Sequence, residues 1–333
     1  MAVWNQISDP KTLENWDASV QGLAGFNPYQ GRYWGSSKSA LGQNVLYFLA
    51  QNDAGQLVAA AQVIVRTFAN KIAQAWIPGG PIGELEAFDE SFRQTLLTAC
   101  KAQYIQIRIS IMRSRLPEDV CTMLQLGWDQ SMVKINSGLS MKYEVPSGKD
   151  SLLETASSNW RHNLRRGLKR NLRVERWNTP SMDEILKVYR SMESFKGIET
   201  QYSESDMRSI FTSLGNNIIL FRSLDDAGNV LALRACVTFG KSGWDFLAAS
   251  SEEGRKQYSS HVLLNAIFNY CAEKSIVNYD MSGISPNAAG GVYKFKKGTG
   301  AKHIEFLGEW EWSSRWWLKL LFNLALLWRQ RRS

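Results

Sequence analysis

The sequence predicts an α/β protein built from two consecutive halves that share one order of elements. Its 333 residues correspond to about two domains of ordinary size. The segment that starts at Asn44, NVLYFLAQNDAGQLVAAAQVIV, matches the segment that starts at Asn217, NIILFRSLDDAGNVLALRACVT, without gaps. The elements expected after each segment also follow in the same order. These observations favour a duplicated domain over a chance similarity between two hairpins.

Each matching segment is expected to form a β-hairpin, because two apolar runs flank an Asp-Ala-Gly turn. Glycine accepts the positive φ angles that tight turns need. In the first half, a helix is predicted at residues 88–103, where Phe92 and Leu96 recur on one face. A strand at residues 104–110 and a short helix at residues 117–126 follow.

The second half repeats this order after its own hairpin. A helix is predicted at residues 259–274 and a strand at residues 276–281. The lysine-rich stretch GGVYKFKKGTG, residues 290–300, is expected to form the short helix, and residues 303–308 are expected to form the last strand. The correspondence therefore extends beyond the hairpins.

The junction between the halves is expected at the segment Val-Pro-Ser-Gly, residues 145–148, whose composition is typical of a linker. A first domain then spans residues 1–145 and a second spans residues 146–309. Residues 310–333, WEWSSRWWLKLLFNLALLWRQRRS, form a separate amphipathic C-terminal helix whose apolar part is too short to span a bilayer. Tryptophans and leucines flanked by arginines suit either packing on domain 1 or peripheral contact with the anionic inner face of the plasma membrane.

The composition is that of a globular protein with a basic excess. Hydrophobic residues make up 44% and charged residues 21% of the chain, so a packed core is available. The net charge of +8 favours anionic partners such as nucleic acid, phosphates or anionic lipid. Four scattered cysteines, no CxxC pair and three histidines argue against a zinc site. We expect a cytoplasmic protein, because the first residues lack the apolar run of a signal peptide.

A strongly basic helix is predicted at residues 157–176, SSNWRHNLRRGLKRNLRVER. Four apolar side chains recur at every fourth position and form one face: Trp160, Leu164, Leu168 and Leu172. Four basic side chains form a parallel stripe: Arg161, Arg165, Lys169 and Arg173. A helix that is merely solvated usually mixes both signs of charge, whereas this segment has seven Lys and Arg residues and one acid, Glu175. We therefore predict a polyanion as its partner, bound through phosphate contacts that carry no sequence readout.

Several segments resemble the FemABX family of peptidyltransferases, which build the cross-bridges of peptidoglycan. They are QGRYWGSSK (residues 30–38) followed by Gly42, WIPGGP (76–81), YDMSGI (279–284), GVYKFKKGTG (291–300) and EFLGE (305–309). The last three form the most specific block. The resemblance covers nearly the whole chain in separate pieces, although Thr299 stands where the family carries an aromatic residue.

The resemblance implies two tandem GNAT-like (acetyltransferase-like) domains with mixed sheets. The coiled-coil arm of some members is expected to be absent, because the second half has no long heptad repeat. The implied activity moves an amino acid from aminoacyl-tRNA to the side-chain amine of the third residue of a peptidoglycan stem peptide. The implied partners are aminoacyl-tRNA as co-substrate and a lipid-linked or nucleotide-linked muropeptide precursor, without a cofactor.

The same resemblance implies roles for individual residues. Lys296 would place its ammonium against the tetrahedral oxyanion of aminoacyl transfer, and Phe295 would shape the site. Lys38 matches the lysine that binds the diphosphate of the precursor. The other substrate-binding candidates are Trp34, Lys196, Tyr258 and Tyr293. The basic stripe becomes the candidate tRNA-binding surface, and no His–carboxylate pair stands out as a general base.

Two other functions stay open. Related double-GNAT proteins resemble acyl-CoA-dependent N-acyltransferases of polysaccharide and cell-envelope synthesis, and a GNAT pyrophosphate loop needs a Q/R-x-x-G-x-G/A turn at a helix start. The corresponding segments, EGRKQYSS at residues 253–260 and GPIGE at residues 80–84, lack that pattern. The basic helix and the C-terminal segment would also suit a non-enzymatic protein that binds RNA or anionic membrane. Substitution of Lys296 would separate catalysis from binding.

Overall fold

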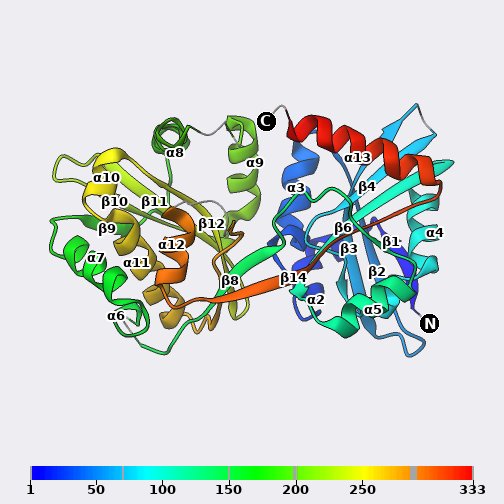
Figure 1. The fold of residues 1–333 in the computed structure, drawn as a ribbon, viewed down its shortest axis with the longest axis horizontal. Coiled ribbons are helices and arrows are strands. Elements are labelled where there is room, and N and C mark those ends of the chain that lie inside the picture. The colour runs from blue at the N-terminus through cyan, green and yellow to red at the C-terminus, as the bar shows by residue number, and fades with distance from the viewer. Residues whose placement is uncertain are drawn as a thin grey trace. The chain divides into compact units, whose positions relative to one another are not determined.

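The computed structural model of the protein describes residues 2–69, 71–148, 151–197, 200, 202–285 and 291–331. Gly290 of the lysine-rich stretch and Arg332 of the C-terminal segment lie outside the described residues. The chain divides into two compact units (Figure 1). Unit 1 comprises Met1–Gly138 and Glu305–Ser333, and unit 2 comprises Leu139–Ile304. The end of the chain therefore returns to unit 1.

Unit 1 contains one main sheet. Its strands follow the order β1 (Val3–Ile7), β2 (Asn44–Gln51), β3 (Leu57–Phe68), β4 (Ile72–Ile77), β6 (Tyr104–Ser114) and β14 (Lys302–Ser313). Neighbours pair antiparallel except β4 and β6, which are parallel. Two short strands pair at the side of this path: β5 (Ile82–Gly83) with β3, and β7 (Asp129–Gln130) with β14.

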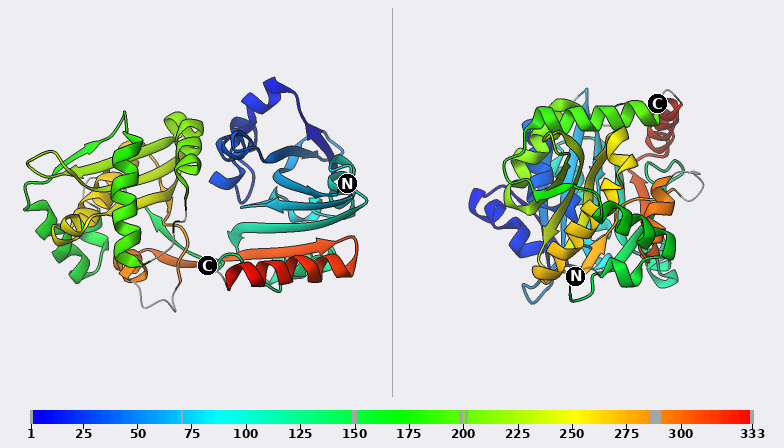
Figure 2. Two further views of the ribbon diagram at one scale, coloured as in Figure 1. Left: turned by 90° about the horizontal axis from the view of Figure 1, so that it is seen from above. Right: turned by 90° about the vertical axis from the view of Figure 1, so that its left-hand side faces the viewer.

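Helices lie on both faces of the unit-1 sheet. They are α1 (Pro10–Glu14), α2 (Trp16–Val20), α3 (Arg32–Ala40), α4 (Glu90–Ala99), α5 (Pro117–Gln125) and α13 (Trp316–Gln330), with 3-10 turns η1 (Pro28–Gln30) and η2 (Leu85–Ala87). Successive residues of a strand point to opposite faces. On β6, Ile107 is buried in a core that includes Phe92 of α4 and Met123 of α5. Arg108 points to the other face, where α13 runs beside β14 (Figure 2).

Unit 2 contains a second sheet. Its strands follow the order β9 (Arg173–Arg176), β10 (Ile218–Leu224), β11 (Val230–Phe239), β12 (Ser242–Ser250), β13 (Asn278–Asp280) and β8 (Leu139–Glu144). Only the pairing of β12 with β13 is parallel, and it spans three residue pairs, Ser242–Trp244 against Asn278–Asp280. Beyond these pairs the hydrogen bonding between the two strands stops. The sheet is therefore mixed, as in unit 1.

The helices of unit 2 also form two layers. They are α6 (Leu152–Thr155), α7 (Ser158–Leu168), α8 (Met182–Lys196), α9 (Glu204–Leu214), α10 (Glu252–Lys256), α11 (Ser259–Glu273) and α12 (Gly291–Gly298), with the 3-10 turn η3 (Gly215–Asn217). Leu164 of α7 and Phe268 of α11 share one core, whereas Ile185 of α8 and Met207 of α9 share another. Helices α7 and α11 accordingly lie opposite α8 and α9 (Figure 1).

The predicted repeat appears as the same succession of elements in both units. The β2–β3 hairpin corresponds to the β10–β11 hairpin, and each is followed by a strand, a helix and a parallel strand. In unit 1 these are β4, α4 and β6, and in unit 2 they are β12, α11 and β13. The sequence prediction of a tandem α/β architecture with mixed sheets is confirmed at this level.

The basic helix is shorter than the sequence predicted. Helix α7 ends at Leu168, and Arg173 lies on strand β9, which pairs antiparallel with β10. The prediction that four basic residues form a stripe on one helix is therefore wrong for Arg173. The expected apolar face is wrong at Leu168, whose side chain is 48% exposed. The strand pairing of residues 173–176 is a non-local interaction that outweighs the local helical pattern.

The C-terminal segment begins as a strand rather than a helix. Strand β14 extends to Ser313, beyond the predicted end at residue 308, and α13 starts at Trp316. The longest described helices are α8, α11 and α13 with 15 residues each, so none of them forms a long coiled-coil arm. Among the described residues, no helix combines the length and the apolar character needed to cross a membrane.

Candidate functional site

Lys296 is a buried lysine in the last turn of α12. Only 7% of this residue is exposed, whereas Lys294 and Lys297 on the same helix are exposed. Its Nζ donates to the carbonyl oxygens of Ser282 (3.1 Å) and Gly283 (2.9 Å). Lysine is almost never buried without partners, because an ammonium that leaves water needs replacement acceptors. These two carbonyls therefore hold the Lys296 ammonium at a defined place in unit 2.

The turn after β13 orients those carbonyls. Ser282 has a φ of 62°, which is uncommon for a residue other than glycine. Its backbone N–H donates to Asp280 Oδ1 (2.8 Å), and its hydroxyl donates to the backbone carbonyl of Asp245. The buried Asp280 also accepts a hydrogen bond from the Ser140 hydroxyl. The Asp280 carboxylate and the backbone carbonyl of Asp245 thus stabilise the left-handed conformation that points the carbonyls at Lys296.

A buried ion pair lies across β11 and β12 beside this turn. Arg234 and Asp245 form two hydrogen bonds of 2.9 and 2.7 Å, and both side chains are almost fully buried. The Tyr279 hydroxyl donates to the same carboxylate at 3.3 Å. Bidentate geometry of this kind compensates part of the cost of removing two charges from water. Asp245 therefore joins the ion pair, through its backbone, to the turn that holds Lys296.

The charges around Lys296 partly offset its burial. Burial lowers the pKa of Lys296, and the Arg234 guanidinium acts in the same direction. The carboxylates of Asp245 and Asp280 act in the opposite direction. Burial in turn raises the pKa of Asp280. The site thus contains one lysine ammonium whose charge is balanced by nearby carboxylates and by two backbone carbonyls.

Phe295 belongs to an aromatic cluster, which we define as Phe295, Trp160 and His261. The Phe295 ring centre lies 5.6 Å from that of Trp160 and 5.0 Å from that of His261, and Trp160 and His261 are 4.8 Å apart. The Arg234 guanidinium lies 5.4 Å from the Phe295 ring centre. The aromatic cluster therefore fixes α12 against α7 and α11, and it places Phe295 between the ion pair and these helices.

His261 is a neutral imidazole inside the aromatic cluster. Burial, with a smaller effect of Arg234, lowers the pKa of His261 to about 4. Its Nδ1 and the Trp160 Nε1 are buried and have no hydrogen-bond partner among the residues that the structure describes. An imidazole with such a low pKa is a weak proton acceptor at neutral pH. We therefore assign His261 a positioning role and no role as a base.

Two of the predicted substrate-binding residues meet on α3 in unit 1. The Lys38 ammonium lies 4.6 Å from the ring centre of Trp34, a cation–π contact. Trp34 is largely buried, and the edge of the Tyr29 ring packs on it with ring centres 4.9 Å apart. Gly35 lets α3 approach the sheet, because a Cβ there would lie 2.1 Å from the Tyr47 hydroxyl oxygen. Lys38 is therefore a positioned, partly exposed cation.

Comparison with known proteins finds a FemAB-like segment in the second half of the chain. Residues 219–325, about a third of the chain, match the model of the FemAB family. This segment of the chain is therefore similar to the FemAB family. Over 96% of its length the chain also shares the fold of FemX, whose crystal structure it covers completely with a TM-score of 0.82 at 17% sequence identity. The residues that surround Lys296, with the exception of Trp160 and Ser140, come from the FemAB segment.

Two further solved structures are similar over nearly their whole length. The tandem GNAT protein from the clavulanic acid biosynthesis pathway shares 10% identity with a TM-score of 0.58, over 95% of this chain and 99% of that one. L-PGS from Bacillus licheniformis shares 13% identity with a TM-score of 0.57, over 97% and 96% of the two chains. No curated protein sequence matches the chain significantly. The tandem GNAT-like fold is thus confirmed. The match to the FemAB family supports an acyltransferase of that family's type.

The two predicted tyrosines lie in different surroundings. Tyr258 precedes α11, accepts a hydrogen bond from Arg166 Nη1 (2.8 Å), and has its ring centre 6.0 Å from that of His261. Tyr293 on α12 forms a hydrogen bond with His303 Nε2 at 3.1 Å. Tyr258 therefore borders the aromatic cluster, and Tyr293 is engaged with the start of β14.

Lys196 is the last residue of α8 and is exposed as a whole. Partial burial of its ammonium end and the nearby Arg255 guanidinium lower the pKa of Lys196. Arg255 itself lies 3.5 Å from the ring centre of Phe195. This group forms a cationic surface on unit 2, and no described contact joins it to the Lys296 turn.

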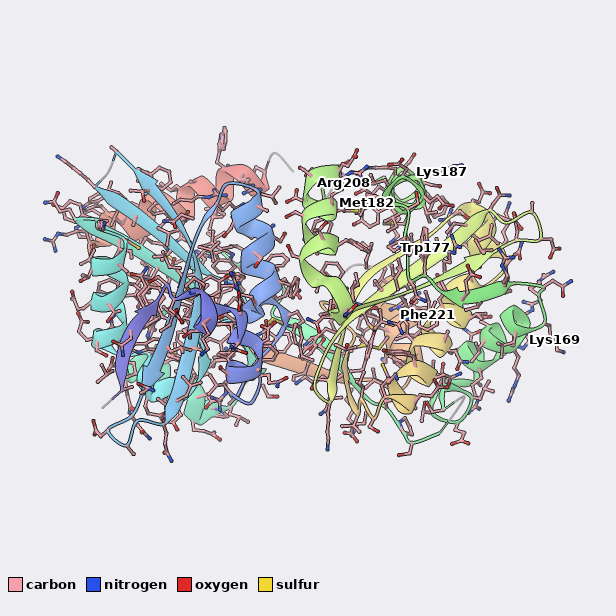
Figure 3. All side chains as sticks on the ribbon, turned by 180° about the vertical axis from the view of Figure 1, so that it is seen from behind. Lys169, Trp177, Met182, Lys187, Arg208 and Phe221 are labelled. Carbon is pink, nitrogen blue, oxygen red and sulfur yellow. The ribbon has the colours of Figure 1, made fainter. Side chains whose placement is uncertain are left out.

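The predicted tRNA-binding residues lie on α7, just after it and on β9 of unit 2, so they do not share one helix. Arg165 is exposed on α7, and Lys169 lies just beyond its C-terminal end at the edge of the unit (Figure 3). Arg173 is exposed on β9 and forms an ion pair with Glu175 (3.5 Å), and Arg161 is partly exposed. The exposed Arg166 and Arg170 add to the same charge.

The segment that corresponds to a GNAT pyrophosphate loop is folded as a helical turn. Residues 252–256 form α10, and the N–H groups of Arg255, Gln257 and Tyr258 are hydrogen-bonded to backbone carbonyls. The N–H of Gly254 is occupied by the Ser251 hydroxyl. The backbone amides that would face a pyrophosphate therefore already donate hydrogen bonds within the protein. This argues against an acyl-CoA donor in unit 2.

The corresponding segment of unit 1 borders a cavity of about 400 Å³. Three carboxylates line it, from Glu84, Glu86 and Asp119, together with Arg113. Asp119 and Arg113 form an ion pair at 3.3 Å. None of the predicted site residues lines this cavity, and the excess of negative charge makes it unsuited to a pyrophosphate.

Sequence reasoning missed Arg234, Asp245 and His261. A signal for the first two was present, because Arg234 interrupts the apolar strand LALRACV and Asp245 interrupts WDFLA. A charged residue at the centre of an apolar strand needs a buried partner. The pairing itself depends on the β11–β12 register, which shifts between Ala235 and Cys236. No feature of the sequence around His261 indicated that it would lie near Lys296.

Proposed function

We propose that this protein is an acyltransferase of the FemABX type that moves an amino acid from aminoacyl-tRNA to the side-chain amine of the third residue of a peptidoglycan stem peptide. The acceptor would be a lipid-linked or nucleotide-linked precursor on the cytoplasmic side of the membrane. The observation that carries the proposal is the buried Lys296 ammonium, which two carbonyl oxygens hold inside the FemAB segment. The reaction requires no cofactor, because the ester of aminoacyl-tRNA is already an activated acyl group.

The proposed reaction is an aminolysis of that ester. The acceptor nitrogen attacks the ester carbonyl carbon, the new C–N bond forms, and the C–O bond to the tRNA ribose breaks. The proton lost by the amine ends on the ribose oxygen. Two of the three N–H donors of Lys296 meet backbone carbonyls, and we propose that the third meets the oxyanion of the tetrahedral intermediate.

The surroundings of Lys296 support this role in two ways. The Arg234–Asp245 pair is buried and the partly buried aromatic cluster packs beside it, so Lys296 needs little reorganisation when charge develops on the substrate. The pKa of His261 is too low for an effective base at neutral pH, and the carboxylates of Asp245 and Asp280 are already engaged in hydrogen bonds. We therefore propose that the ribose hydroxyl or the substrate itself carries the proton between the amine and the leaving oxygen.

The remaining predicted residues fit binding roles. Lys38, held over the Trp34 ring, is proposed to bind the diphosphate of the precursor. The exposed cations at and beyond the end of α7 are proposed to bind the tRNA backbone. Such contacts would supply affinity without selecting the amino acid, because phosphates carry no sequence information.

A matched pair of lysine variants tests the central role of Lys296. Lys296→Met removes the ammonium and keeps an unbranched side chain, so transfer should fall by about 100-fold or more. Binding of the tRNA should change little. Lys294→Met removes an exposed ammonium from the same helix and should leave transfer near the wild-type rate. The measurement is a reconstituted assay with charged tRNA and a nucleotide-linked muropeptide, monitored by the mass shift of the acceptor.

The same assay distinguishes the donors. Ribonuclease treatment of the charged tRNA should abolish the mass shift, and acyl-CoA in its place should give none. Transfer from acyl-CoA alone would contradict the aminoacyl-tRNA assignment, and wild-type transfer by Lys296→Met would contradict the role of Lys296. Equal loss of transfer and tRNA binding in Lys296→Met would mean that Lys296 acts in binding, and would also contradict its catalytic role.

A further inference from the structure

Helix α13 is attached to unit 1 through a polar side chain on its inner face. Asn323 is 3% exposed and accepts a hydrogen bond from Arg108 Nη2 at 2.9 Å. It donates to both carboxylate oxygens of Glu311, at 2.9 and 3.1 Å. Arg108 also pairs with Glu309 at 3.0 Å, and all these side chains are buried. We call Asn323, Arg108, Glu309 and Glu311 the polar anchor.

The outer face of α13 is apolar. Seven large apolar side chains are between 37% and 77% exposed: Trp316, Trp317, Leu320, Leu321, Leu324, Leu327 and Trp328. At 3.6 residues per turn they occupy one continuous arc of about 140°. A surface helix of a soluble protein usually turns such a stripe toward the core. Here the polar anchor fixes the helix with most of its apolar stripe outward, and a patch of this kind marks an interaction surface.

The charge that this segment itself carries is entirely positive. Residues 312–333 contain five Lys and Arg residues and no Asp or Glu. Arg315 lies at the start of α13, and Arg329 and Arg331 lie at its end. Lys319 forms an ion pair with Asp129 at 3.0 Å and supports the attachment of the helix. Cations therefore flank both ends of the apolar stripe.

We propose that α13 is a surface by which unit 1 docks on anionic lipid. A helix with an apolar stripe, flanking cations and tryptophans near both ends has the features of helices that lie in the plane of a membrane interface. Anionic head groups complement the arginines, whereas a second copy of the same helix would bring like charges together. The inference is independent of the transfer reaction, because it rests on no residue near Lys296.

A vesicle-binding experiment with matched variants tests this surface. The full chain should float with vesicles that contain phosphatidylglycerol and should bind much less to vesicles of phosphatidylcholine alone. Leu320→Glu combined with Leu324→Glu places two charges in the stripe and should weaken binding to the anionic vesicles by about tenfold or more. Leu124→Glu is the control, because Leu124 on α5 and Leu324 are each 53% exposed. It should bind like the wild type.

A second variant addresses the charge. Arg329→Gln combined with Arg331→Gln should weaken binding to anionic vesicles and reduce its sensitivity to salt. Failure of the wild type to bind anionic vesicles would overturn the proposal, and so would equal binding by the Leu320/Leu324 variant. A concentration-dependent dimer that this variant dissociates, without vesicle binding by the wild type, would identify a second copy as the occupant. Transfer to a nucleotide-linked acceptor should be unchanged in both variants, because that acceptor needs no membrane. A failure of the wild type to transfer would therefore contradict the enzymatic proposal without affecting the proposal about α13.

Discussion

At the scale of single residues, Lys296 illustrates how a charge is kept in a buried place. Burial alone favours the neutral amine, and Arg234 adds to this effect. Two carbonyls and the carboxylates of Asp245 and Asp280 favour the ammonium. The resemblance to FemABX proteins pointed to Lys296, but no local pattern could predict its partners. These partners depend on the left-handed backbone conformation of Ser282, which the sequence does not predict.

His261 provides a pH-dependent prediction at the same scale. Its pKa is about 4 in the folded protein and close to 6.5 in the unfolded chain. Between these values the unfolded chain binds the proton first, so stability should fall as the pH drops from about 6.5 to 4. The loss attributable to this residue should approach about 3 kcal/mol, because each pKa unit corresponds to about 1.4 kcal/mol. His261→Phe keeps a ring in the aromatic cluster and should remove this component.

The measurement is the free energy of unfolding in urea at pH 7, 6 and 5. At pH 7 the His261→Phe variant should be about as stable as the wild type, and the two should diverge as the pH falls. His162→Gln changes an exposed histidine of α7 and should leave the pH dependence as it is in the wild type. Identical pH profiles for the wild type and His261→Phe would show that His261 does not titrate as the burial implies.

At the scale of elements, local patterns predicted structure well where local interactions decide it. The two hairpins followed from apolar runs around Asp-Ala-Gly, and α11 was predicted to within one residue of its end at Glu273. The basic helix was predicted too long because residues 173–176 pair with β10, a strand more than 40 residues later. The prediction also placed residues 310–313 in the C-terminal helix, whereas they continue the pairing of β14 with β6.

The attachment of α13 gives an element-scale prediction. Asn323→Ala removes a buried side chain that makes hydrogen bonds with Arg108, with Glu311 and with the carbonyl of Lys319. Alanine has the higher helix propensity, so any loss of stability must come from the polar anchor. We expect the free energy of unfolding to fall by about 2–4 kcal/mol, because two buried charged groups lose a partner.

Urea denaturation followed by circular dichroism measures this effect. Leu324→Ala, the next position on the same helix, is the control and should change stability by less than about 0.5–1 kcal/mol because its side chain is mostly exposed. If Asn323→Ala were as stable as the wild type, the polar anchor would not hold α13, and the outward orientation of its apolar stripe would lose its basis.

At the scale of the whole molecule, the tandem architecture was accessible from the sequence and much of the site was not. The repeat consists of the same order of elements in both units, and local sequence patterns predict such an order. The Arg234–Asp245 pair and the aromatic cluster are formed by residues far apart in the chain. Their side chains meet only after β11, β12, α7, α11 and α12 have packed. The sequence showed that Arg234 and Asp245 are charged residues within apolar strands, but it did not show that they pair with each other.

The net charge of +8 leads to a prediction about where the anionic partner binds. If tRNA phosphates contact the basic surface of unit 2, a variant with four glutamines there should bind tRNA with a weaker dependence on salt. The slope of log K against log salt should decrease in magnitude by about 3, because each lost phosphate contact removes roughly 0.7–0.9. The substituted residues are Arg165, Arg166, Lys169 and Arg170.

A charge-matched control separates a located binding surface from the general charge of the protein. It replaces four exposed lysines that lie elsewhere, Lys11, Lys71, Lys187 and Lys241, with glutamine. Both variants have a net charge of +4, which is +8 less four. Long-range attraction should fall equally in the two proteins, so only direct phosphate contacts can make their slopes differ. Equal slopes in the two variants would mean that the basic surface at the end of α7 contributes charge without being the place where tRNA binds.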